Sequence, residues 1–132
     1  MRTELLKLLP ADKHDTAKAE ALATLGFPAV EPVLPALLEW VQDCNWPVAR
    51  ILLPLLATAG LALKLPVQQI LDGSDECWKY SVLASLVLHS PELTLALLPE
   101  IERLANNPTP GEKMEAIDEL AQDILTRSQH LN

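Results

Sequence analysis

Two short stretches of the sequence gather the side chains best suited to recognition. The stretch EWVQDCNWPVARILLPLL (residues 39–56) and the stretch SDECWKYSVLASLVL (residues 74–88) together contain Asp43, Asn45, Trp46, Arg50, Asp75, Glu76, Trp78, Lys79 and Tyr80. Tryptophan, tyrosine and arginine dominate binding hot spots, and mixed charges beside them can orient a partner. Alternatively, Trp46 and Trp78 wedge between helices while Asp43 and Asp75 cap helix N-termini. Both interpretations stay open, and the nine residues form a candidate binding surface.

The three histidines give little indication of a metal site. Asp12, His14 and Asp15 lie together in the stretch DKHD, where a metal site or an acid–base pair is conceivable. No second histidine lies nearby, and no HxxxH or HxxE spacing occurs, so turn and cap chemistry explains these residues better. His89 follows an apolar helix, where the helix dipole favours a cation, and His130 lies in the C-terminal tail. We expect no metal ligands.

The other reactive groups also have structural explanations. Cys44 and Cys77 have neither metal-ligand spacing nor a disulfide framework. Packed helices lie about 10 Å apart, beyond the roughly 7 Å that a disulfide allows between Cα atoms. The stretch NNPTPGE (residues 106–112) leads into a helix as phosphate loops do, but Glu112 at the helix start would repel an anion. With no catalytic signature in the sequence, we expect no catalytic residue and no cofactor, and we favour a protein that is not an enzyme.

Composition and charge limit the possible partners. The chain has 132 residues, enough for one domain with its own core, and its formal net charge is −8. The ten basic residues are scattered, so binding to nucleic acid is not expected. A basic protein partner would be steered to such a surface, although ordinary solubility also explains the charge. No apolar run approaches the roughly 20 residues of a membrane span, and no signal peptide is recognisable. We expect a cytoplasmic protein.

Helix caps and apolar spacing predict an all-α fold of about seven short helices. After an N-terminal segment (residues 1–13), the expected helix starts are Asp15, Pro32, Pro47, Pro66, Asp75, Ser90 and Thr109, and Pro99 divides the sixth helix. Gly26 is a good left-handed C-cap. The last helix should place Met114, Ile117, Leu120, Ala121, Ile124 and Leu125 on its apolar face. Residues 129–132 are expected to be a frayed tail.

A weak internal repeat of about 30 residues relates the two recognition stretches. Val48, Leu52, Leu53 and Leu56 correspond to Trp78, Val82, Leu83 and Leu86. The segment from Leu37 to Gly60 resembles HEAT repeats, which place an Asp in the turn between helices and a Val and an Arg at the start of the second helix. Such a repeat predicts a small right-handed α-solenoid built from antiparallel hairpins.

Over most of its length the chain resembles an uncharacterised family of small bacterial proteins, the domain of unknown function 5071. The similar pieces are DKHD (residues 12–15), LLEWVQDCNWPVA (residues 37–49), WKY (residues 78–80) and NPTPGE (residues 107–112). The resemblance implies a bacterial all-helical domain. It implies no catalytic residues, because none is established for the family.

These observations favour a protein-binding module without enzymatic activity, for example an immunity or antitoxin-like protein that blocks a toxin. One alternative is a small-molecule binder or enzyme with a site between helices near Asp43, Arg50, Trp78 and Tyr80. Another is an assembly role through self-association. The sequence does not determine the oligomeric state.

Overall fold

The computed structural model describes residues 2–129, and within them the chain forms ten α-helices and no strand. The helices are α1 (Arg2–Lys7), α2 (Thr16–Leu25), α3 (Leu34–Glu39), α4 (Pro47–Ala57), α5 (Lys64–Leu71), α6 (Glu76–Val82), α7 (Pro91–Ala96), α8 (Leu98–Asn106), α9 (Pro110–Met114) and α10 (Ile117–Gln129). Two short 3-10 segments, η1 (Glu31–Val33) and η2 (Gly60–Leu63), precede α3 and α5, and a π-helical segment, η3 (Leu83–Val87), extends α6. The predicted all-α class is confirmed. The expected tail lies, apart from Gln129, outside the described residues.

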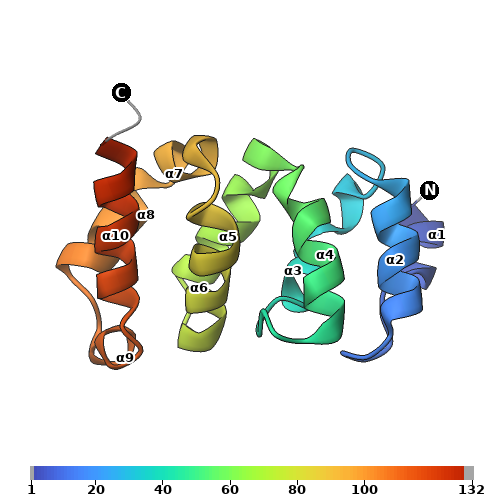
Figure 1. Cartoon of the computed structure of the whole chain (residues 1–132), viewed down its shortest axis with the longest axis horizontal. Coiled ribbons are helices and arrows are strands. Elements are labelled where there is room, and N and C mark those ends of the chain that lie inside the picture. The colour runs from blue at the N-terminus through green and yellow to red at the C-terminus, as the bar shows by residue number, and fades with distance from the viewer. Residues whose placement is uncertain (1, 130–132) are drawn as a thin grey trace.

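The helices stand side by side along the long axis of the molecule (Figure 1). In this view the chain rises through α2, α4, α6 and α10 and descends through α3, α5 and α8, which lie behind them. Helix α2 packs against α4, α5 against α6, and α8 against α10. The turns that precede the rising helices therefore all lie along one edge of the molecule (Figure 1). We call residues 10–15, 40–46, 72–76 and 107–116 the lower edge.

The core runs the length of the molecule and consists mainly of leucine and valine. The apolar stripe predicted for α4 is buried, with Val48, Leu52 and Leu56 fully inaccessible to solvent. The longer helices α2, α4, α8 and α10 contribute buried apolar side chains at three- and four-residue spacing. Within residues 2–129, no helix combines the length and the apolar character needed to cross a membrane.

Most of the predicted caps are confirmed. Side-chain oxygens of Asp15, Asp75, Ser90 and Thr109 accept hydrogen bonds from backbone N–H groups of α2, α6, α7 and α9 respectively. Gly26 is the C-cap of α2 with φ 73°, as its type suggested, but its ψ of 179° is extended rather than left-handed helical. A side chain with a Cβ rarely adopts this backbone conformation, which explains the glycine there.

The structure corrects two details of helix placement. Asp43 does not cap α4: its Oδ1 accepts from the N–H of Asn45 within the turn, and the N-cap residue is Trp46. The carbonyl of Lys13 instead accepts the N–H of Val48, so an N-terminal turn supplies part of the cap. Helix α5 begins at Lys64, not at Pro66, because the segment before it continues into the helix as a 3-10 turn.

The expected last helix is two helices. Ala116 has φ 59°, which interrupts the chain between α9 and α10. Because of this break, Met114 does not share the apolar face of α10 and is 85% exposed, whereas Ile117, Ala121 and Ile124 are buried as predicted. Helix α1 was also missed, since the N-terminal segment carries no clear cap.

Candidate functional site

Trp40 and Trp46 form an aromatic corner at the base of the α3–α4 hairpin. Trp40 is the C-cap residue of α3 and Trp46 is the N-cap residue of α4, so the turn between them brings the two indoles together. Their ring centroids lie 6.3 Å apart and the planes are inclined at 63°, the edge-to-face arrangement that aromatic pairs prefer. Both rings pack partly against the core and remain partly accessible to solvent.

Trp78 connects the second recognition stretch to the first. Its indole N–H donates to the carbonyl oxygen of Leu38 at 3.0 Å, and the buried hydroxyl of Ser81 donates to the carbonyl of Val41 at 2.6 Å. These carbonyls belong to the last turn of α3 and the residues just after it, where helical hydrogen bonds run out. Side chains of α6 therefore bind two carbonyl oxygens at the C-terminal end of α3, and the two stretches are neighbours in space.

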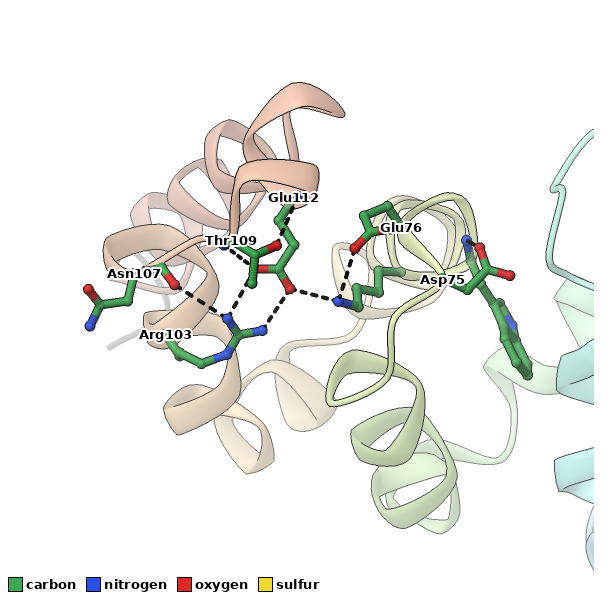
Figure 2. A network of polar contacts seen from close by, with 8 residues as sticks. Asp75, Glu76, Arg103, Asn107, Thr109 and Glu112 are labelled. Carbon is green, nitrogen blue, oxygen red and sulfur yellow. Dashed lines mark hydrogen bonds and ion pairs between the residues drawn. The ribbon is translucent and has the colours of Figure 1, made fainter.

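Lys79 takes part in a buried ion cluster that joins α6, α8 and α9 (Figure 2). Its Nζ lies 2.7 Å from Oε2 of Glu112, whose side chain is completely buried. Arg103 reaches the same carboxylate with two hydrogen bonds of 3.0 and 2.8 Å, a bidentate arrangement that fixes its orientation. Glu76 lies 3.7 Å from the Lys79 ammonium. The ammonium of Lys79 is consequently paired inside the protein, and Lys79 is only 2% exposed.

The surroundings of Glu112 keep its carboxylate ionised. Burial alone would raise the pKa of Glu112, but hydrogen bonds from Arg103 and Lys79 and from the backbone N–H of Thr109 together lower the pKa to about 2. The hydrogen bonds that Arg103 donates to Glu112 also raise the pKa of Arg103. The capping box predicted at Thr109 and Glu112 is confirmed, with both reciprocal hydrogen bonds present. Sequence reasoning missed the two cations on Glu112, because Lys79 lies 33 residues away.

The rest of the predicted surface is accessible. Asp43, Asn45, Arg50, Asp75 and Tyr80 are exposed, while Trp46, Glu76 and Trp78 are partly buried. The two free cysteines differ in their exposure to solvent: Cys44 is partly buried and Cys77 is exposed. Some of the nine predicted binding residues thus lie at the protein surface. Others, Lys79 above all, hold helices together. Binding by these residues remains a prediction.

The lower edge is distinctly acidic. Its four segments contain eight acidic residues and two lysines, and only Glu112 among the acids is buried. The turns at the opposite edge of the molecule with the residues just after them, 26–31, 58–61 and 88–92, contain only two acidic residues, Glu31 and Glu92, and no Lys or Arg. The negative charge in the turns is therefore concentrated on one side of the molecule.

An apolar groove lies between α3 and α5, and Trp78 is among the residues that line it. It has a volume of about 500 Å³, and its lining includes Pro32, Pro35, Glu39 and Ile70 together with Trp78. Asp43, Arg50 and Tyr80 are not part of that lining. Among the residues that the structure describes, no group of three or more His, Cys, Asp or Glu side chains is arranged to hold a metal ion.

The chain belongs to the family described as "Domain of unknown function (DUF5071)", whose model matches residues 8–125. This match covers the lower edge, the aromatic corner and the ion cluster completely. A search of curated proteins found no match.

Proposed function

We propose that this member of the DUF5071 family is a non-enzymatic protein-binding module of the bacterial cytoplasm, and that its lower edge receives a basic surface of a protein partner. The observation that carries the proposal is the one-sided charge of the turns: eight acids and two lysines on the lower edge. A concentrated negative field of this kind attracts a basic protein and accelerates its association.

Helix capping accounts for only part of this charge. Asp15 and Asp75 are N-caps, and carboxylates are favourable at helix N-termini because of the helix dipole. Asp43, however, caps no helix: its Oδ1 accepts from the N–H of Asn45 within the turn. Its exposed charge is therefore not explained by N-capping.

We include the finer architecture in the proposal: a small right-handed, HEAT-like α-solenoid. Alternating rising and descending helices, with equivalent turns along one edge, are the arrangement that such a solenoid would have (Figure 1). Solenoids commonly bind partners along continuous surfaces of this kind. An immunity or antitoxin-like protein that blocks a basic toxin is one concrete form of this function.

The alternative, a small-molecule or catalytic site near Asp43, Arg50, Trp78 and Tyr80, has less support. Of these four residues only Trp78 lines the apolar groove between α3 and α5.

The test is affinity capture from extracts of the source bacterium with two matched variants. The edge variant carries Asp12→Asn, Asp43→Asn and Asp75→Asn; each of these carboxylates accepts a backbone hydrogen bond that an Asn side-chain oxygen can still accept. The control variant carries Glu20→Gln, Glu102→Gln and Glu119→Gln, three exposed acids on helices. Both variants lose three negative charges.

A protein captured by the wild type and the control, but lost with the edge variant, supports the proposal. Equal capture of all proteins by the edge variant and the control contradicts it, because the position of the charge would then be irrelevant.

A further inference from the structure

We propose that the aromatic corner is a pocket for a single arginine side chain of the protein partner. The inference rests on the proposed function, since it specifies how part of a basic partner is held beside the lower edge. It concerns the small pocket lined by Glu39, Trp40, Gln42 and Trp46.

The two indoles provide two differently oriented walls. With planes inclined at 63° and centroids 6.3 Å apart, the rings form a corner rather than a stack. A flat guanidinium can lie over the face of one indole, where the ring quadrupole attracts a cation. Among the amino acids, arginine combines a delocalised charge with a planar group that stacks on aromatic faces.

The polar part of the lining matches the same ligand. Glu39 is exposed and contributes a carboxylate, and Gln42 contributes an amide whose oxygen can accept a hydrogen bond. The lining includes no Lys or Arg. Two indole rings, a carboxylate and an amide oxygen are the groups that would bind a guanidinium fork through stacking and charge-assisted hydrogen bonds. Core packing explains why the rings meet, but it does not require a carboxylate beside them.

The size of the pocket fits one side chain. Its volume of about 250 Å³ is below the roughly 300–1,000 Å³ that is typical of small-molecule sites. Three of its four lining residues, Trp40, Gln42 and Trp46, belong to the lower edge, so a basic surface docked on that edge would lie next to the pocket.

The turn that carries the pocket is held by its own hydrogen bonds. Asp43 Oδ1 accepts from Asn45 N–H at 2.8 Å, and the Asp43 carbonyl accepts from Trp46 N–H at 3.1 Å. A preorganised turn loses little conformational entropy when a ligand binds, which favours affinity.

The three tryptophans allow a direct test in the full-length protein. Each indole N–H gives one signal in an NMR spectrum of ¹⁵N-labelled protein, and Trp→Phe variants assign them. The probe is a capped hexa-arginine peptide; the matched probes are the neutral hexa-citrulline peptide, which has nearly the same shape, and the hexa-lysine peptide. Trp78 is an internal reference, because its N–H is bonded to Leu38.

We expect the Trp40 and Trp46 signals to shift saturably with hexa-arginine, to shift little with hexa-citrulline, and to shift less with hexa-lysine, while the Trp78 signal stays in place. Glu39→Gln should weaken hexa-arginine binding about tenfold, since it removes one charge-assisted hydrogen bond. Glu102→Gln, an exposed acid on α8, should change it less than about twofold.

Three results would overturn the pocket: shifts of equal size at Trp78, equal binding of hexa-citrulline or hexa-lysine, or no effect of Glu39→Gln. Different results would contradict the pocket and the proposed function. If hexa-arginine bound to the lower edge, and the Asp12, Asp43 and Asp75 variant weakened it while Trp40 and Trp46 did not respond, the pocket alone would be wrong. If partner capture were unaffected by that variant, the proposed function would be wrong.

Discussion

Lys79 and Glu112 form a direct ion pair of 2.7 Å between two side chains that are both almost inaccessible to solvent. The pair links the last turn of α6 to the capping box at the start of α9 (Figure 2). Because Arg103 of α8 binds the same carboxylate, one glutamate fixes the relative positions of three helices. This cluster positions the part of the lower edge formed by residues 72–76 and 107–116.

Glu112→Gln should destabilise the protein by roughly 3–5 kcal/mol, because it leaves the buried Lys79 ammonium with only the partly exposed Glu76, 3.7 Å away, as a counter-charge. Lys79→Met should cost less, since Glu112 keeps its bidentate Arg103. Urea unfolding followed by circular dichroism measures both. The control is Asp123→Asn, which breaks the exposed Asp123–Arg127 pair and should cost less than about 1 kcal/mol. A Glu112→Gln variant as stable as this control would contradict the structural role of the cluster.

The contribution of Glu112 to stability should disappear in acid. Its folded pKa of about 2 lies below the ordinary value of 4.5, so its ionised form stabilises the fold above about pH 4.5 and is progressively lost as the pH falls toward 2. The depressed pKa is worth at most about 3 kcal/mol. The difference in unfolding free energy between wild type and Glu112→Gln should be largest near pH 7 and shrink below about pH 4.5. A difference that is constant with pH would show that ionisation of Glu112 does not stabilise the fold.

Ser81→Ala should lower the unfolding free energy by about 1–2 kcal/mol, because it removes the buried hydrogen bond to the Val41 carbonyl. Thr126→Ala is the matched control: its hydroxyl also donates to a carbonyl, that of Gln122, but on an exposed helix face. We expect a change of less than about 0.5 kcal/mol there. Equal effects of the two substitutions would mean that the contact between α6 and the end of α3 contributes little.

Ala116→Gly should leave the protein equally stable or stabilise it by up to about 1 kcal/mol. The residue has φ 59°, a conformation that costs a side chain with a Cβ roughly 1–2 kcal/mol and glycine almost nothing. Ala121→Gly, at a buried position within α10, should cost about 1 kcal/mol or more. Thermal and urea unfolding compare the two. If both glycines were equally destabilising, the break between α9 and α10 would not be governed by Ala116.

The parts of the fold that depend on local sequence were predictable. Asp15, Asp75, Ser90 and Thr109 cap helices because a short side chain can reach a backbone N–H two or three residues away. The break at Ala116 was not predictable, because alanine is a strong helix former and its residue type does not indicate a positive φ. Met114 was assigned to the wrong face for the same reason.

The sequence predicted which residues belong to the candidate site better than it predicted how they are arranged in space. The sequence pattern predicted that Trp46 and Trp78 lie on neighbouring hairpins, and the structure places both partly against the core. Patterns could not identify Glu112 as the partner of Lys79, since that contact depends on how α9 turns back toward α6. Nor could they show that the acids of four separate turns share one edge, which follows only from the order of rising and descending helices.

The central claim is that the lower edge binds a basic protein, and the most direct test is the dissociation constant of the captured partner, measured by calorimetry at low and high salt. We predict that the edge variant, with Asp12→Asn, Asp43→Asn and Asp75→Asn, binds the partner at least about tenfold more weakly than wild type at low salt. This loss of affinity should shrink at high salt, where the charges are screened. The control variant, with Glu20→Gln, Glu102→Gln and Glu119→Gln, should keep a dissociation constant within about threefold of wild type. Equal dissociation constants for the edge and control variants would contradict the claim.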